Sequence, residues 1–339
     1  MSTSRTPEGT VYHEILAPHV GAEFDLVRDL CRDALHDAAA LGYVAHYAGG
    51  QFDLSLDRLA EPAPEPDALP GGTRREDLQR FGRVLGFELE QTDGMLREVQ
   101  SGGLIRIALQ TENGAAVAAR VVPGQHVVGV VLDAVSPHNA EPVPDAVVHR
   151  VDESVSHLST RLRRLISLGS QNPGGFETAP LEPSTEGPGS AAGAVTRQAE
   201  PTDRARLLDD LCVDALDPAG LHLVAVYSAG TTELMVDCLE HESLRTFFTN
   251  ITVSARRAFY ERFGQGLDAL AVRFNRAARH ALGGRIHRLV LDVEQGAIYC
   301  YRLGTGVYLV GITMSQAQVY PAELRMAALA TAARDLLAR

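Results

Sequence analysis

The sequence has few cysteines, no long apolar run and no cationic excess. Its four cysteines show no CxxC spacing and are too sparse for a disulfide framework. No run approaches the roughly 20 apolar residues that span a bilayer, and the first residues lack the apolar core of a signal peptide. The net charge of −12 disfavours binding to nucleic acid or to anionic lipid. These absences predict a cytoplasmic protein without a membrane span.

Motifs for catalysis and for cofactors are also missing. The twelve histidines form no HExxH motif and no Cys/His cluster. The run Gly304-Thr305-Gly306 lacks the Lys-Ser/Thr of a P-loop, and it joins two expected strands instead of opening a helix. No Gly-x-Ser-x-Gly elbow occurs. We therefore expect no metal, no cofactor and no enzyme activity.

The strongest positive feature is an internal repeat. Residues 296–313 read as two strands around a Gly-Thr-Gly turn, and residues 114–131 echo them 182 positions earlier. Residues 25–35 match 206–216, and Arg-Phe-Gly occurs at 80–82 and again at 262–264. The residues shared by the two hairpins are Gly114, Ala115, Arg120, Gly124 and Gly129, which recur as Gly296, Ala297, Arg302, Gly306 and Gly311. A chain of 339 residues accommodates two such domains, each of about 130–150 residues. We expect copy 1 at 22–168, a Gly/Pro/Ser-rich linker at 169–202 and copy 2 at 203–339.

Each copy reads helix, two strands, helix, three strands, helix. Apolar spacing predicts the first helix on Leu26, Leu30, Ala34, Val27, Cys31 and Leu35. The middle helix is expected at 74–99 in copy 1, and from 241 to 282 with a bend at 264–266 in copy 2. The expected strands are 43–48, 52–57, 104–110, 115–122 and 126–134, and then 221–228, 232–237, 286–293, 297–303 and 307–313. The closing helices present stripes of Val147, Val151, Val155, Leu158, Leu162 and Leu165, and of Leu324, Ala328, Ala332 and Leu336.

The last strand of each copy is apolar without alternation, at 127–132 and 307–312. Such a run is typical of a strand that is covered on both faces. The pattern therefore predicts an α/β sandwich in which a five-stranded antiparallel sheet lies between helices.

This order of elements, together with the glycine-turned hairpin, resembles the roadblock/LC7 family. Copy 1 departs from it through a proline-rich loop at 61–72 and a Val-Pro-Gly-Gln turn. The resemblance implies dimers whose sheets join at an edge strand, and regulation or scaffolding of small Ras-like GTPases or service as a motor-complex adaptor. Here the two copies are expected to form a tandem pseudo-dimer with a continuous sheet, because pairing satisfies exposed strand edges. Homo-oligomers through the same edges are also possible.

A basic stretch stands out in this acidic chain. Its arginines either dock on an acidic partner or form a solvated helix face, and the sequence favours neither. The candidate partner-binding residues are Arg256, Arg257, Arg262, Arg273, Arg276 and Arg279. Arg120 and Arg302, repeated before the hairpin turn, are interpreted as structural in preference to arginine fingers.

The expected function is a non-catalytic scaffold or regulator of a small Ras-like GTPase or of a larger complex. One alternative is a secretion-chaperone-like protein that binds a client segment, which a strand at 61–71 would favour. The other is a small-ligand sensor, against which the lack of converging polar residues among the apolar strands argues.

Overall fold

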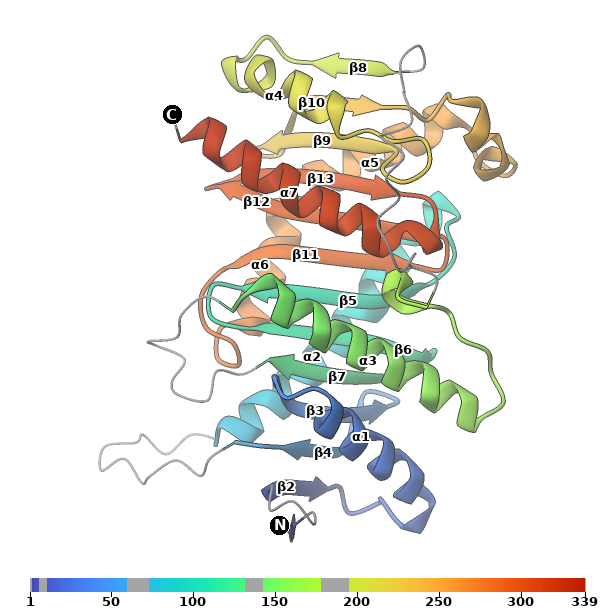
Figure 1. Ribbon diagram of the computed structural model, residues 1–339, viewed down its shortest axis with the longest axis vertical. Helices are drawn as coiled ribbons and strands as arrows, with labels where there is room; N and C mark the ends of the chain where they lie inside the picture. Colours follow the sequence, from blue (N-terminus) through green and yellow to red (C-terminus); the bar gives the residue numbers. More distant parts are fainter. Residues whose placement is uncertain (1, 6–10, 60–72, 132–142, 178–194, 339) are drawn as a thin grey trace. The chain divides into compact units, whose positions relative to one another are not determined.

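The computed structural model describes residues 2–5, 11–59, 73–131, 143–177 and 195–338 (Figure 1). The chain divides into two compact units. Unit 1 comprises Met1–Thr92, Ile105–Gln171 and Asn275–Arg285. Unit 2 comprises Asp93–Leu104, Asn172–Phe274 and Ile286–Arg339. Each unit thus takes most of its residues from one repeat and a short segment from the other.

Unit 1 contains an antiparallel sheet in the order β1-β2-β4-β3-β7-β6-β5. Its strands are β1 Ser2–Arg5, β2 Val11–Leu16, β3 Leu41–Ala48, β4 Gln51–Asp57, β5 Leu104–Thr111, β6 Ala115–Val122 and β7 Gln125–Val131. Its helices are α1 Asp25–Asp37, α2 Arg74–Leu96 and α3 Asp145–Leu165. A single 3₁₀ turn, Arg97–Val99, continues α2.

The helices of unit 1 lie on both faces of its sheet, with α1 and α3 on one face and α2 on the other (Figure 1). His126 packs against Gly86 of α2, whereas Gly129 packs against Val155 of α3. Positions 126 and 129 of a strand point to opposite faces, because side chains alternate along it. The expectation of a strand covered on both faces is confirmed.

Unit 2 repeats this plan, with an antiparallel sheet in the order β11-β12-β13-β9-β10-β8. Its strands are β8 Thr196–Ala199, β9 Leu223–Ser228, β10 Thr231–Asp237, β11 Ile286–Val293, β12 Gly296–Gly304 and β13 Val307–Thr313. Its helices are α4 Asp203–Asp214, α5 Val253–Gln265, α6 Leu267–Ala278 and α7 Val319–Leu337. The predicted fold class, an antiparallel α/β arrangement with five matching strands in each copy, is confirmed.

Three details of the sequence prediction are wrong. The middle helix of copy 2 does not start at 241, because a 3₁₀ segment Glu242–Phe248 precedes α5. The break has a local cause, because the Thr252 hydroxyl accepts a hydrogen bond from the Ala255 amide and so starts a new helix. The expected bend at 264–266 is confirmed, since α5 ends at Gln265 and α6 begins at Leu267. Strands β1, β2 and β8 at the sheet edges were not predicted. The proposed strand at 61–71 and the end of the expected strand at 132–134 lie outside the described residues.

The face of the closing helix α7 is the third error. Leu324 is 45% exposed, and Ala328 and Ala332 are exposed as well, so the predicted stripe does not face the core. Met326 packs on Gly311 instead, and Ala330 is fully buried. Alanine occurs on every side of this helix, so apolar spacing alone did not select the buried face.

The buried face that the sequence predicted for the first helix, α1, is also only partly correct. Cys31 and Leu35 are fully buried, and the repeated Cys212 is buried too, as the sequence predicted. Leu26 is 62% exposed, because the helix turns its first residues outward. The core face of α1 therefore begins about one turn later than the apolar pattern suggested.

Recurring residues of the repeat occupy equivalent buried contacts. The hydroxyl of Tyr47 donates to the carbonyl of Gln79 at 3.0 Å, and Tyr227 donates to the carbonyl of Tyr260 at 3.0 Å. Arg106 of β5 forms a buried ion pair with Asp152 of α3, both 0% exposed. Arg288 of β11 pairs with Glu323 of α7 in the same way. Each pair holds the closing helix on its sheet.

Candidate partner-binding surfaces

Arg257 is held inside unit 2 by a carboxylate. Its Nε lies 2.7 Å and its Nη2 2.9 Å from the two oxygens of Asp237, at the end of β10. This hydrogen bonding raises the pKa of Arg257. Arg75 makes the same bidentate contact with Asp57 in unit 1, at 2.8 and 3.0 Å. Arg257 is therefore the repeat of a structural clamp between a helix and a strand end.

Arg256 is 2% exposed. Its guanidinium donates to the carbonyl of Val99 at 2.9 Å and lies over the ring of Phe248. A group this deeply enclosed does not reach a partner surface while these contacts hold. It fixes the segment Asp93–Leu104 within unit 2.

The other four candidate arginines differ in exposure. Arg262 is exposed and forms an ion pair with Glu98, which is also exposed. Arg273 is half-buried. Arg276 and Arg279 are exposed, and they belong to unit 1, whereas Arg262 and Arg273 belong to unit 2. Arg256 and Arg257 are thus held by contacts inside unit 2, Arg273 is half-buried, and the other three arginines are exposed.

The repeated hairpin arginines also differ from each other. The side chain of Arg120 is 8% exposed and donates to Glu90 at 3.2 Å. The carbonyl of Arg302 accepts hydrogen bonds from Arg334 of α7 at 3.2 Å. Burial of Arg120 between α2 and the sheet agrees with a structural role.

A chain of polar groups lies inside unit 1, where Asp53 joins two histidines. Its carboxylate oxygens lie 2.7 Å from His46 Nδ1 and 2.8 Å from His19 Nε2. Burial raises the pKa of Asp53, but the hydrogen bonds from His46 and His19 bring it below its usual value. The second nitrogen of His46 faces the amide of Gln125 at 2.8 Å, where a nucleophile would stand in a catalytic triad. This row of hydrogen-bonded side chains therefore ends at the amide of Gln125, and its role is structural.

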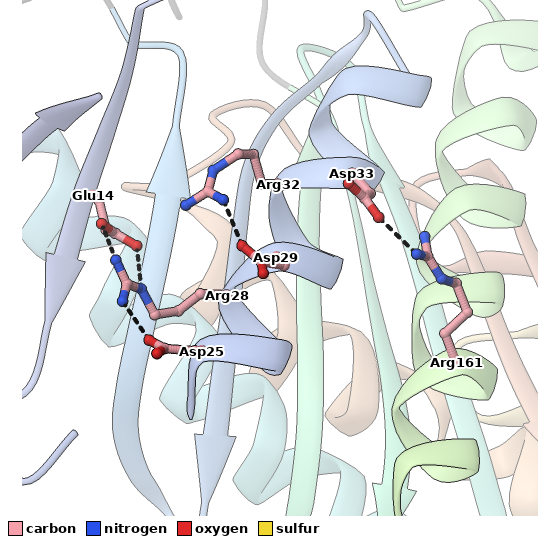
Figure 2. Close-up of polar contacts among 7 residues, drawn as sticks. All are labelled: Glu14, Asp25, Arg28, Asp29, Arg32, Asp33 and Arg161. Carbon is pink, nitrogen blue, oxygen red and sulfur yellow. Dashed lines mark hydrogen bonds and ion pairs between the residues drawn. The ribbon is translucent and has the colours of Figure 1, made fainter. Parts of the chain in front are cut away.

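An ion-pair network covers α1 (Figure 2). Arg28 donates to both carboxylate oxygens of Glu14, at 2.8 and 3.0 Å, and to Asp25 at 2.8 Å. Because Glu14 belongs to β2, this contact ties β2 to the helix. Farther along α1, Asp33 reaches Arg161 of α3 at 2.6 Å (Figure 2). The ion pair between Asp33 and Arg161 therefore links α1 to α3.

A hollow of about 450 Å³ lies between α1, the segment that follows it, and α3. Its floor is apolar, and its wall contains the small residues 38–40, all alanine. The buried floor residues are Ala34, Val151 and Leu158. The charged residues around it are Asp37, Arg150, Glu153, His157 and Arg161. Charged side chains therefore surround a hollow on the helical face of unit 1.

The part of the chain that the structure describes contains no group of three or more His, Cys, Asp or Glu side chains arranged as metal ligands. Among the helices of these described residues, none combines the length and the apolarity that crossing a bilayer requires.

Comparison with known proteins found similar solved structures. MglB in a tetrameric arrangement is 14% identical, over 43% of this chain and 91% of its own, with a TM-score of 0.32. The gliding protein MglB from Thermus thermophilus is 14% identical, over 43% and 92%, with a TM-score of 0.31. A Roadblock/LC7 domain from Streptomyces avermitilis is 19% identical, over 41% and 100%, with a TM-score of 0.28. No family model and no curated protein matches the chain.

Proposed function

We propose that this chain is a non-catalytic scaffold or regulator that binds a small Ras-like GTPase. The observation that carries the proposal is the order of elements, helix, two strands, helix, three strands, helix, built twice around an antiparallel sheet. That order resembles the roadblock/LC7 family, for which such binding is implied. A larger multiprotein complex is the other partner that the same resemblance implies.

Exposed arginines supply a chemical basis for docking. Arg276 and Arg279 are exposed, and no ion pair or hydrogen bond to either side chain occurs within the described residues. Guanidinium groups recognise carboxylate and phosphate through bidentate hydrogen bonds. We propose these two residues, together with exposed Arg262, as partner-binding groups.

The proposal is tested by pull-down of candidate small GTPases, each loaded with GTP or with GDP, on the immobilised full chain. We expect retention of at least one GTPase with a preference for one nucleotide state. The double variant R276Q/R279Q should weaken retention, whereas R206Q should not, because Arg206 is an exposed arginine on α4 that already pairs with Asp203. Equal failure of all candidates would remove the GTPase from the proposal.

We also propose that copies 22–168 and 203–339 pair within one chain through the linker 169–202. A linker of this size gives a high effective concentration of one copy for the other. Light scattering on the separately produced copies tests this pairing. Mutual association or homodimers are expected, and two stable monomers without affinity for each other would contradict it. A cytoplasmic location is part of the same proposal.

A further inference from the structure

The closing helices of the two units can be compared position by position. The buried ion pairs align Asp152 of α3 with Glu323 of α7. The two contacts on strand glycines align Val155 with Met326. Both alignments give the same spacing of 171 positions. Position 154 of α3 therefore corresponds to position 325 of α7.

In unit 2 an arginine occupies this position. The Nη1 atom of Arg325 lies 2.9 Å from Oδ2 of Asp217, in the segment between α4 and β9. The side chain of Asp217 is 13% exposed, and its other oxygen accepts from the Ala219 amide at 2.9 Å. A guanidinium thus joins the closing helix of unit 2 to the segment after its first helix.

In unit 1 the corresponding residue is Ser154, and the hollow of about 450 Å³ lies there. Among the described residues, the Ser154 hydroxyl reaches only the carbonyl of Ala34, at 3.4 Å. Asp37 ends α1 on one side of the hollow, and Glu153 lies on α3. Both carboxylates are exposed, and among the described residues neither takes part in an ion pair or hydrogen bond.

The two arginines at the rim make contacts of their own, whereas no contact of the third basic group, His157, occurs within the described residues. Arg161 donates to Asp33 at 2.6 Å, and Arg150 donates to the carbonyl of Ala146 at 3.3 Å. Within the described residues, no basic side chain therefore contacts the carboxylate of Asp37 or of Glu153. The apolar floor suits the methylene stem of a long cationic side chain, which buries its stem and keeps its charged end among polar groups.

We propose that this hollow binds the guanidinium group of an arginine side chain presented by a partner protein. The arginine enters between α1 and α3, its stem lies over Ala34 and Leu158, and its guanidinium donates to the carboxylates of Asp37 and Glu153. It takes the place that Arg325 occupies in unit 2. The site rests on the protein-binding role proposed above, but it does not depend on the partner being a GTPase.

The site is tested on the full chain labelled with ¹³C at its alanine methyl groups, because Ala38, Ala39 and Ala40 line the hollow. The probe is N-acetyl-L-arginine methylamide, and the matched control is N-acetyl-L-citrulline methylamide, which has nearly the same shape without the charge. We expect saturable shifts of these three methyl signals with the arginine probe and none with citrulline.

Variants separate the site from a general effect of charge. S154R places a guanidinium in the hollow from inside the chain and should abolish the saturable shifts. D37N removes one of the two carboxylates that the guanidinium contacts, so it should weaken binding about tenfold, a difference of about 1.4 kcal/mol. D29N removes an exposed carboxylate elsewhere on α1 and should leave binding unchanged.

Equal shifts with arginine and citrulline would overturn the proposal, and so would the absence of saturation up to the solubility limit of the probe. Wild-type binding in D37N would overturn it as well, whether or not S154R folds. The titration with the arginine probe involves no GTPase. A negative titration therefore does not test GTPase binding, and a negative pull-down does not test arginine binding.

Discussion

The ring of Tyr47 lies directly against Gly82 of α2, so that a Cβ on this glycine would overlap the tyrosine hydroxyl. Tyr227 meets Gly264 of α5 in the same way. The hydroxyl of each tyrosine also donates to a helix carbonyl. The glycine of the repeated Arg-Phe-Gly therefore lies where the middle helix approaches the sheet too closely for any side chain.

Replacing either glycine with alanine should destabilise the protein. We expect G82A and G264A each to lower the free energy of unfolding by about 1–3 kcal/mol, because overpacking displaces a fully buried tyrosine. G94A is the matched control on α2, since a Cβ at Gly94 meets nothing within 4 Å. It should raise stability by up to about 1 kcal/mol through helix propensity. Urea unfolding measures all three, and a neutral G82A would contradict the close approach.

Breaking the buried ion pair of Arg106 and Asp152 should lower the free energy of unfolding more than breaking the exposed pair of Arg161 and Asp33. D152N leaves the fully buried Arg106 without its counter-charge, so we expect a loss of about 3–5 kcal/mol. D33N breaks the pair with Arg161, whose side chain is 39% exposed, and should cost less than about 1 kcal/mol. Chemical denaturation of the two variants compares them. Similar losses in both would contradict the inferred role of the buried pair.

The buried environment of His222 should make the protein less stable in acid. Its Nδ1 accepts from the Met314 amide at 2.9 Å and its Nε2 donates to the carbonyl of Pro218 at 3.2 Å, so the neutral ring satisfies both contacts. Burial lowers the pKa of His222 from 6.5 to about 4. Because the unfolded chain binds this proton first, the contribution is complete above pH 6.5 and is lost as the pH falls towards 4.

Between pH 7 and pH 5 this group alone should remove about 2 kcal/mol. The variant H222Q should show a drop in unfolding free energy that is smaller by that amount, although it starts from a lower value at pH 7. H36Q, at an exposed position on α1, is the matched control for the loss of a histidine. An unchanged pH dependence in H222Q would show that the ring is not held in its neutral form.

Replacing different arginines of copy 2 should change the free energy of unfolding by different amounts. R257Q breaks the bidentate contact with Asp237 and should lower the free energy of unfolding by about 1–3 kcal/mol. R276Q removes an exposed cation and should change it by less than about 0.5 kcal/mol. Thermal and urea unfolding give the comparison. Equal stability of the two variants would contradict the division into clamps and exposed cations.

The repeat made most of the fold predictable, because each strand and helix could be read in two sequences. The repeat also relates two pairs of arginines. Arg256-Arg257 lies 182 positions after Arg74-Arg75, and this match would have indicated that Arg257 is a clamp like Arg75. A cluster of positive charge alone does not distinguish a buried guanidinium from a docking group.

Other features depended on tertiary contacts. The buried face of α7 is set by Gly311 and Arg288, two residues distant in sequence, and not by its own apolar spacing. Strand β2 precedes the first copy of the repeat, so no second copy indicates it, and the contact of Glu14 with Arg28 ties it to α1. The hollow beside Ser154 is formed by α1, residues 38–40 and α3, and α3 is distant in sequence from the other two and meets them only in the folded chain.

The proposed function is tested most directly by the affinity of the full chain for a small Ras-like GTPase in its two nucleotide states. Isothermal titration would use the GTPase that the pull-down retains, loaded with GDP or with a non-hydrolysable GTP analogue. A regulator or effector scaffold should bind one state at least tenfold more tightly, a difference of about 1.4 kcal/mol. Equal affinity for the two states, or no binding to either, would contradict regulation of a GTPase by this chain.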